Sequence, residues 1–251
     1  MFNPTPYYAF YSHFDGYNQR LMETIRSLLE FPVLDVLELG CGIGLSTRAL
    51  RTAFPDAEIT ASDQSKSMIG FAVANFPDSR VTYNVADAEV FLRHIAERRF
   101  DLVFIKSAYH MFEEQVPLNN LTKVLRQAGA VVIVERTERS AKSYPLFDAA
   151  RAHWSTYFAA ARLDYRLSIA RRRGLDLRIG SYGEYVEVPS KIYIDAIRAG
   201  QLSFLEPFRR EVIESWCESE LLKHLTTVLV FEEFWTYIHA LNKKDPETFQ
   251  R

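Results

Sequence analysis

Apolar residues follow two alternating patterns along the first half of the chain. Short, nearly continuous apolar runs, typical of buried parallel strands, are followed by segments whose apolar residues recur every three or four positions, as in amphipathic helices. The predicted strands cover residues 33–39, 57–62, 81–85, 100–105 and 130–134, and the predicted helices between them cover 45–54, 65–76, 88–95 and 118–125. This alternation predicts an α/β fold with a parallel sheet covered by helices on both faces.

The second half departs from this alternation. Residues 144–169 have the pattern of an amphipathic helix or helix pair with an aromatic stripe. A sixth strand is predicted at 175–188 with a bend at 180–183, followed by a helix at 189–199, helical pieces within 204–225 and a last strand from 226 that extends toward 240. The arginines at 171–173 fit either a solvated helix end or recognition of an anion. The pattern therefore predicts helical insertions beside the sheet.

Three glycines within five residues follow the first predicted strand, at Gly40, Gly42 and Gly44. Glycine is needed where the backbone passes close to a ligand or adopts a positive φ. Leu45 stands where a dinucleotide fingerprint requires its third glycine. Glu38, at the end of the strand, is expected to point into the ligand crevice. The run indicates a nucleotide-type cofactor site, and the alternative is only a tight strand-to-helix turn.

Two acids follow the next strands, where ligands of doubly wound sheets bind. Asp63 follows the second strand, where a carboxylate can accept hydrogen bonds from both hydroxyls of a ribose; the alternative is that it caps the next helix. Asp87 follows the third strand and can accept the exocyclic amine of adenine while the N–H of Ala88 donates to a ring nitrogen; the alternative is again a helix cap. Residues 106–112 follow the fourth strand.

Residues 33–135 together resemble the small-molecule branch of the class I S-adenosylmethionine-dependent methyltransferases, of the type 11/25-like kind. The resemblance implies a Rossmann-like, doubly wound, mostly parallel seven-stranded sheet with an antiparallel last strand and helical lid insertions. It implies S-adenosyl-L-methionine as the cofactor and methyl transfer to an oxygen, nitrogen or carbon of a small, partly apolar molecule. The residues it assigns to the cofactor are Glu38, Gly40, Cys41, Gly42, Gly44, Asp63, Gln64, Met68, Asp87, Ala88, Lys106 and Ser107.

Methyl transfer from a sulfonium is an in-line displacement, so proximity and exclusion of water supply much of the catalysis. His110 is the first candidate for a proton acceptor, although a histidine here can equally pack against the lid or hydrogen-bond the substrate. Glu135, at the end of the fifth strand, is the second, and its alternative is an ion pair with Arg136. The expected substrate contacts are Tyr7, Tyr11, Tyr109, His110, Trp154, Tyr157 and Phe158. Such aromatic residues fit an apolar substrate wall or a packed lid.

We expect one methyltransferase domain over residues 1–251, with an N-terminal aromatic lid at 1–30, the cofactor-binding half at 31–136, a helical substrate lid with the sixth strand at 137–225 and the last strand and tail at 226–251. Thirty basic against thirty-two acidic residues give a net charge of −2, which disfavours bulk nucleic acid as a partner. The missing Asn/Asp-Pro-Pro-Tyr/Phe run after the fourth strand also argues against methylation of nucleic-acid amines.

Cys41 and Cys217 are too far apart in sequence to indicate a disulfide framework, and neither paired His nor paired Cys spacing indicates a metal. No apolar run is long enough to span a bilayer, so no membrane association is expected. A reducing, cytoplasmic location follows. A homodimer is possible, and the sequence does not decide the oligomeric state, because an exposed aromatic lid and a dimer interface have the same composition.

Two other functions remain open at this stage. The same fold can hold S-adenosylmethionine without transferring its methyl group, as in a cyclase. A nicotinamide oxidoreductase is disfavoured by Leu45 and by the lack of a Tyr-x-x-x-Lys pair in the later helices.

Overall fold

The computed structural model describes residues 3–95, 97, 99–112, 118–136, 176–200, 209–221 and 228–241. Its helices are α1 (Pro4–Tyr11), the 3₁₀ turn η1 (Ser12–Phe14), α2 (Asp15–Leu28), α3 (Leu45–Ala53), α4 (Lys66–Asn75), α5 (Ala88–His94), α6 (Tyr109–Phe112), α7 (Leu118–Lys123), α11 (Ser190–Arg198) and α12 (Arg210–Leu221). Its strands are β1 (Asp35–Leu39), β2 (Glu58–Asp63), β3 (Val81–Val85), β4 (Phe100–Lys106), β5 (Leu125–Arg136), β6 (Asp176–Pro189) and β7 (Val228–Leu241).

The strands form one sheet in the order β3-β2-β1-β4-β5-β7-β6. The first five are parallel, as the sequence predicts, and the chain reverses its winding direction between β1 and β4. Strand β7 lies between β5 and β6 and is antiparallel to both. The order thus puts a topological switch point between β1 and β4, where the carboxyl ends of these strands can bind a ligand.

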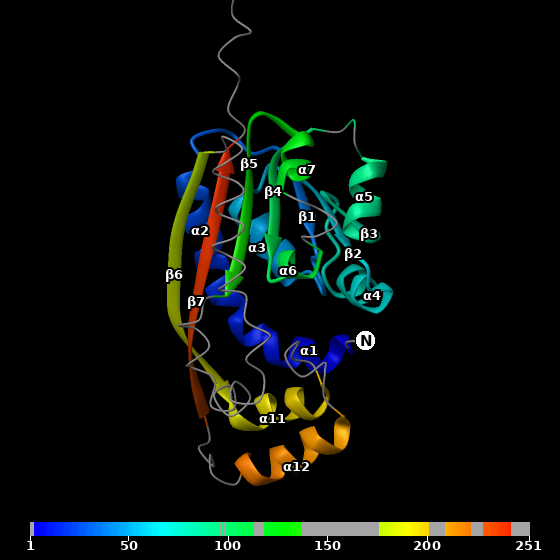
Figure 1. Cartoon of the computed structure of the whole chain (residues 1–251), viewed down its shortest axis with the longest axis vertical. Helices are drawn as coiled ribbons and strands as arrows, with labels where there is room; N and C mark the ends of the chain where they lie inside the picture. The colour runs from blue at the N-terminus through cyan, green and yellow to red at the C-terminus, as the bar shows by residue number, and fades with distance from the viewer. Residues whose placement is uncertain are drawn as a thin grey trace, which may run out of the picture.

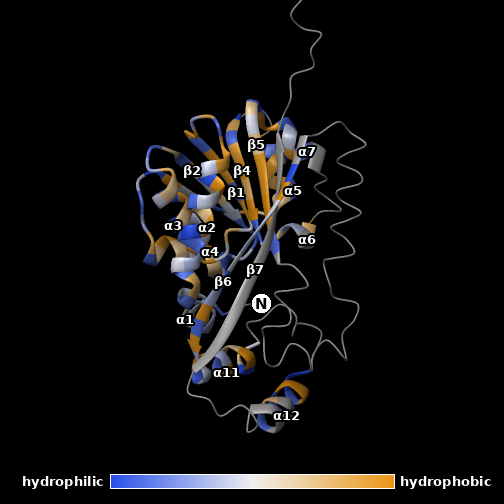
Figure 2. Ribbon diagram, turned by 90° about the vertical axis from the view of Figure 1, so that its left-hand side faces the viewer, coloured by the Kyte–Doolittle hydropathy of each residue, from blue (hydrophilic) through white to orange (hydrophobic). Residues whose placement is uncertain are grey.

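Alternation of side chains along the central strands divides the core into two layers. Leu102 and Phe104 pack with α2 and α3 on one face, and Val103 and Ile105 pack with α5 and α7 on the other. The side view in Figure 2 shows these helices on opposite sides of a sheet whose strands β1, β4 and β5 are strongly apolar. Strands buried on both faces have continuous apolar sequences, which is why the sequence predicts them clearly.

The N-terminal segment differs from the predicted lid. Phe10, Phe14 and Tyr17 are buried in the main core with Tyr193 of α11, so this half of the aromatic cluster is core rather than a cover. Helix α1 runs across the lower end of the sheet in Figure 1, with α11 and α12 beyond it. The carboxyl ends of the parallel strands point toward α1, so α1 lies at the end of the sheet where a ligand is expected.

The predicted helix at 118–125 ends earlier than its apolar pattern suggests. Helix α7 stops at Lys123, and β5 begins at Leu125, paired with Phe100 before a register shift. Gly129 makes this possible, because a Cβ there would lie 2.9 Å from the Phe100 carbonyl oxygen. Strand β5 is therefore longer than the apolar run at 130–134. The predicted insertion at 144–169 lies outside the described residues.

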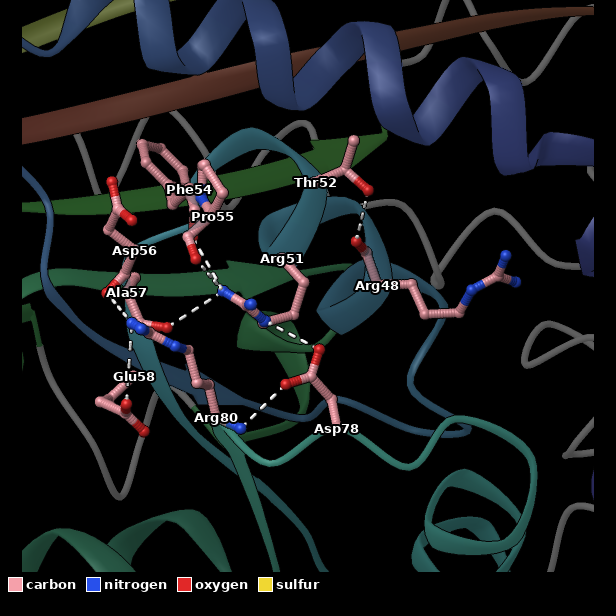
Figure 3. Close-up of polar contacts among 10 residues, drawn as sticks. All are labelled: Arg48, Arg51, Thr52, Phe54, Pro55, Asp56, Ala57, Glu58, Asp78 and Arg80. Atoms are coloured by element: carbon pink, nitrogen blue, oxygen red, sulfur yellow. Dashed lines mark hydrogen bonds and ion pairs between the residues drawn. The ribbon is translucent and has the colours of Figure 1, made fainter.

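The amino end of the sheet carries an ionic cluster, drawn in Figure 3. The guanidinium of Arg51 donates to Asp78 Oδ2 at 3.0 Å and to the carbonyl oxygens of Phe54, Pro55 and Ala57. Arg80 completes the cluster by donating its backbone N–H to Asp78 Oδ1. These bonds fasten the end of α3 to the starts of β2 and β3.

Candidate functional site

The loop between β1 and α3 is held in a defined shape by its own backbone. The N–H groups of Gly40 and Cys41 donate to the Ser62 carbonyl oxygen of β2, at 2.8 and 3.0 Å, and the N–H of Gly44 donates to the Cys41 carbonyl oxygen. All three glycines have positive φ, namely 75° at Gly40, 54° at Gly42 and 85° at Gly44. The predicted turn is therefore present, and it is tied to the neighbouring strand.

The three glycines are required for different reasons. A Cβ at Gly40 would lie 2.4 Å from the Ala108 methyl carbon, and a Cβ at Gly44 would lie 2.8 Å from the Tyr83 hydroxyl. A Cβ at Gly42 would meet no atom within 4 Å. The outer glycines are thus explained by packing inside the protein. Gly42 instead leaves space beside the loop, which is what close approach of a ligand to the backbone requires.

Asp63, the last residue of β2, connects this loop to the next helix. Its Oδ2 accepts the N–H of Gly42 at 2.9 Å, and its Oδ1 accepts the N–H of Ser65 at 2.8 Å. The alternative that Asp63 caps α4 is wrong, because the Ser65 side chain is the N-cap and accepts the N–H of Met68. The structure therefore brings Asp63 and Gly42 together, as a cofactor site would need.

Glu38 is oriented differently from the expectation. Its side chain is 1% exposed and lies under the start of α3, where Ser46 Oγ donates to Oε1 at 2.5 Å and Thr47 Oγ1 donates to Oε2 at 2.6 Å. Burial raises the pKa of Glu38 to about 7, although the two hydroxyls and the charge of Lys106 favour its ionised form. The carboxylate thus binds the first turn of α3, directly after the glycine loop, instead of pointing into a crevice.

Sequence reasoning missed the partners of Glu38. Ser46 and Thr47 follow the loop in the first turn of α3, and their hydroxyls were the available signal, because hydroxyls at a helix start commonly seek a polar partner. Tyr83 of β3 interacts with Thr47 in the same network, and burial is the main cause that raises the pKa of its hydroxyl. No sequence pattern marks Tyr83, since its role depends on the neighbouring strand.

Asp87 lies after β3, as predicted, and its Oδ1 caps α5 by accepting the N–H groups of Glu89 and Val90. The interpretation of Asp87 as a helix cap is confirmed. Binding of adenine by the same residue stays a prediction. Among the other residues assigned to the adenine side, Gln64 is exposed, whereas Met68 and Ala88 are buried. Cys41 is also buried, which raises the pKa of its thiol.

The turn after β4 lies against the glycine loop. Ser107 has a φ of 54°, unusual for a residue other than glycine, and its N–H donates to the Val134 carbonyl oxygen. Lys106 precedes it, and Ala108 contacts Gly40. Tyr109 is buried against the ring of Phe112, so the structure places this predicted substrate contact in the core.

The predicted catalytic residues lie on neighbouring elements. His110 belongs to the short helix α6, and its side chain is outside what the structure describes. Glu135 is buried near the end of β5, opposite Thr236 of β7. Trp154, Tyr157 and Phe158, predicted to contact substrate, lie outside the described residues.

Tyrosines of α1 cover one side of the glycine loop. Tyr7 and Tyr8 pack with Ile43 of the loop and with Met68 of α4. The rings of Tyr7 and Tyr11 lie 4.3 Å apart between centroids, and Tyr8 contacts the ring of Phe71 at 5.3 Å. This part of the N-terminal segment does lie beside the predicted cofactor site, unlike the buried part.

The described part of the chain offers neither a metal-binding cluster nor a membrane-spanning helix. No group of three or more His, Cys, Asp or Glu side chains is arranged there to hold a metal ion. No helix within these ranges is long and apolar enough to cross a membrane.

Residues 36–129 match the family model described as "Methyltransferase domain". The chain is 29% identical over 126 residues to the malonyl-[acyl-carrier protein] O-methyltransferase of Acetivibrio thermocellus, covering 47% of this chain and 44% of that protein. It is 30% identical over 136 residues to the trans-aconitate 2-methyltransferase of Methylobacterium radiotolerans, covering 53% and 50%. The match thus spans about half, or less, of the length of these curated relatives.

Solved structures show the same fold. The plantazolicin methyltransferase BpumL, solved in complex with SAH, aligns with a TM-score of 0.55 and 14% identity over 96% of this chain and 86% of that one. The sequence and fold comparisons agree with the resemblance that the glycine loop and the strand-end acids indicate.

Proposed function

We propose, from the methyltransferase domain that residues 36–129 carry, that this chain is a class I S-adenosylmethionine-dependent methyltransferase acting on a small organic molecule. The match covers only about half of each relative, so the relatives do not establish the activity of the whole chain. The proposal therefore also rests on the site at the glycine loop of this chain. The named relatives act on malonyl-[acyl-carrier protein] and trans-aconitate, which supports a small organic acceptor or acyl group.

One observation carries this proposal. Gly42 is the loop glycine whose absent side chain leaves open space, and Asp63 accepts its N–H from the end of the neighbouring strand. The combination offers a ligand an approachable backbone beside an acid, which suits the methionine portion and ribose of S-adenosylmethionine. Packing contacts account for Gly40 and Gly44 but not for the open space beside Gly42.

The remaining cofactor contacts follow from the strand ends. Asp63 would accept the ribose hydroxyls, and Gln64, Met68, Asp87 and Ala88 would border the adenine. Cys41, Lys106 and Ser107 would lie at the methionine side, while Glu38 holds the loop in place through Ser46 and Thr47. When bound, the cofactor supplies an electrophilic methyl group on a sulfonium.

The chain's own part in the reaction would be to position the acceptor and exclude water. The α1 tyrosines provide an apolar cover beside the glycine loop, which supports a partly apolar substrate. An oxygen, nitrogen or carbon acceptor that arrives protonated needs a base. We assign that role first to His110, which follows β4, and second to the buried Glu135.

The finer organisation is also part of the proposal. We place the substrate lid at residues 137–225 within a single domain of 1–251, with the seven-stranded arrangement completed by the antiparallel β7. The near-neutral net charge of −2 supports a small-molecule acceptor over nucleic acid.

The first experiment is calorimetric titration of the full chain with S-adenosylhomocysteine, with NAD⁺ as the competing ligand. We expect binding of the first ligand and no heat from the second. Asp63→Ala should weaken binding by about 10- to 100-fold, because hydrogen bonds to a charged group are worth about 1.5–3 kcal/mol. Asp56→Ala is the matched control, since Asp56 is exposed at the opposite end of the sheet. Binding of NAD⁺ alone would overturn the proposal.

A second experiment separates methyl transfer from binding without transfer. Radiolabelled S-adenosylmethionine is incubated with candidate acceptors bearing hydroxyl, amine or carboxyl groups, and product label is counted. His110→Ala should lower turnover at saturating cofactor while affinity for S-adenosylhomocysteine stays within a few-fold. Unchanged turnover would remove His110 from the mechanism.

A further inference from the structure

Strand β6 forms one end of the sheet, and among the described strands it pairs only with β7. The outward N–H and C=O groups of such an edge can pair with another strand, and natural edge strands are usually short or protected by charged residues or proline. Strand β6 runs over 14 residues from Asp176 to Pro189, and its central residues 179–183 carry no charge. Figure 1 shows β6 along the left margin of the sheet.

We propose that this edge pairs with the β6 edge of a second copy of the chain, giving an antiparallel homodimer with a continuous sheet. A two-fold axis makes such an interface self-complementary, so each contact occurs twice. The proposal does not depend on the proposed methyl transfer, because it rests on β6 alone.

Symmetry limits the possible registers. In an antiparallel pair, directly opposite residues alternate between hydrogen-bonded and non-hydrogen-bonded pairs. A two-fold axis perpendicular to the sheet must exchange pairs of the same kind. One residue must therefore face its own copy across the axis, which lies midway between the two copies, and the choice of that residue sets all other partners.

Charge selects one register. An axis through Ser181 puts Arg178 opposite Glu184 of the second copy, at two symmetric positions. Axes through residues 179, 180, 182 or 183 put Arg178 opposite a glycine, a tyrosine or a valine instead. Opposite charges that face each other across strands stabilise a pair, and here each would extend the existing bond between Arg20 and Glu184.

Two other features fit the same register. Tyr182 would face Gly180 of the second copy, and an aromatic side chain opposite an edge glycine covers the exposed backbone there. Ile179 and Tyr185 are 46% and 69% exposed on the opposite face of β6 from Tyr182. Tyr185 of one copy would lie diagonal to Ile179 of the other, within reach of an aromatic ring. Charge, glycine packing and the exposed apolar residues thus agree.

The test is a disulfide across the proposed axis. Opposite residues have Cα atoms about 4.5–5.5 Å apart, within the range of a disulfide. The variant Ser181→Cys should therefore form a covalent dimer under mild oxidation, seen on a non-reducing gel. The native Cys41 and Cys217 are buried, so they should not contribute. Glu187→Cys is the matched control, because the two copies of Glu187 would lie about 40 Å apart in this register.

Sedimentation velocity of the unmodified full chain should show twice the monomer mass of 29.0 kDa. Arg178→Glu places like charges opposite each other twice and should raise the dimer dissociation constant at least about tenfold. Arg93→Glu on α5 is also a charge reversal of an exposed arginine, away from β6, and should leave the mass unchanged. Circular dichroism confirms that both variants fold.

The outcomes are decisive in either direction. A monomer at all concentrations with no Ser181→Cys crosslink would overturn the dimer, as would equal crosslinking of Glu187→Cys. Copurification of a different protein whose binding Arg178→Glu removes would assign the edge to another partner and would equally reject the second copy.

Discussion

Charged side chains lie at both ends of the parallel sheet, but Asp78 at one end and Glu38 at the other have different hydrogen-bond partners and opposite pKa shifts. At the amino end, the carboxylate of Asp78 accepts hydrogen bonds from the backbone N–H of Arg80 and from the side chain of Arg51, and these two bonds lower its pKa. At the carboxyl end, Glu38 and Asp63 are held by hydroxyls and backbone N–H groups. Burial there raises the pKa of Glu38 to about 7.

The charged groups at the amino end thus stabilise the fold, whereas those at the carboxyl end include an acid that a ligand can reach. The amino-end ions neutralise one another and fasten the strand starts to α3. The carboxyl-end acids accept hydrogen bonds from hydroxyl and backbone N–H groups of the glycine loop and α3, and Asp63 lies beside the open space at Gly42. Four substitutions test this contrast.

The largest effect is expected from Gly40→Ala. The new methyl group would collide with the Ala108 Cβ at 2.4 Å, and neither backbone can move away easily. Left-handed strain of about 1–2 kcal/mol and overpacking of about 1–3 kcal/mol together predict a loss of about 2–5 kcal/mol, measured by urea unfolding. Gly42→Ala is the matched control: it should lose only the strain energy, yet weaken S-adenosylhomocysteine binding. Equal destabilisation by both would reject the distinction between these glycines.

Glu38→Gln should change the pH dependence of stability. A carboxyl whose pKa is higher in the folded state than its usual 4.5 binds more protons when folded, so stability falls as pH rises from about 4.5 to about 7 and is level above. This contribution amounts to roughly 3 kcal/mol for a shift to about 7. Unfolding free energies of both proteins across that window should diverge by this amount. Parallel curves would show that Glu38 titrates normally.

Arg51→Ala should lower stability by about 2 kcal/mol, because carbonyl oxygens near the end of α3 lose a charged donor. S-adenosylhomocysteine affinity should not change, since the cluster lies at the opposite end of the sheet from Gly42. Chemical unfolding and calorimetry on the same variant measure both quantities. A loss of affinity comparable to that of Asp63→Ala would break the proposed division between the two ends.

Arg93→Ala should have the smallest effect. Arg93 pairs with Glu89 one turn away on the surface of α5. Exposed pairs of this kind contribute about 0.3–0.5 kcal/mol. Thermal unfolding should therefore differ only slightly from that of the unmodified chain, and the difference should shrink at high salt. A larger, salt-independent loss would mean that the pair supports α5 packing.

Much of the cofactor-binding half was predictable because its signals are local. The apolar runs of β1, β2 and β4 lie within a residue or two of the observed strands, and the glycines at 40, 42 and 44 do form a turn of positive φ. The end of α7 was not predictable, because Val124 and Leu125 continue its apolar spacing while the register of β5 against β4 ends the helix.

The sequence by itself determined the α/β alternation, the glycine turn and the acids that follow the strands, since each depends on neighbouring residues and on backbone geometry. Only the tertiary structure decided that Glu38 turns under α3, that Phe10 belongs to the core while Tyr7 lies on the glycine loop, and that Gly42 alone of the three faces open space. Those outcomes depend on which side chains meet across separate elements, and burial and steric contact between distant residues leave no periodic signal along the chain.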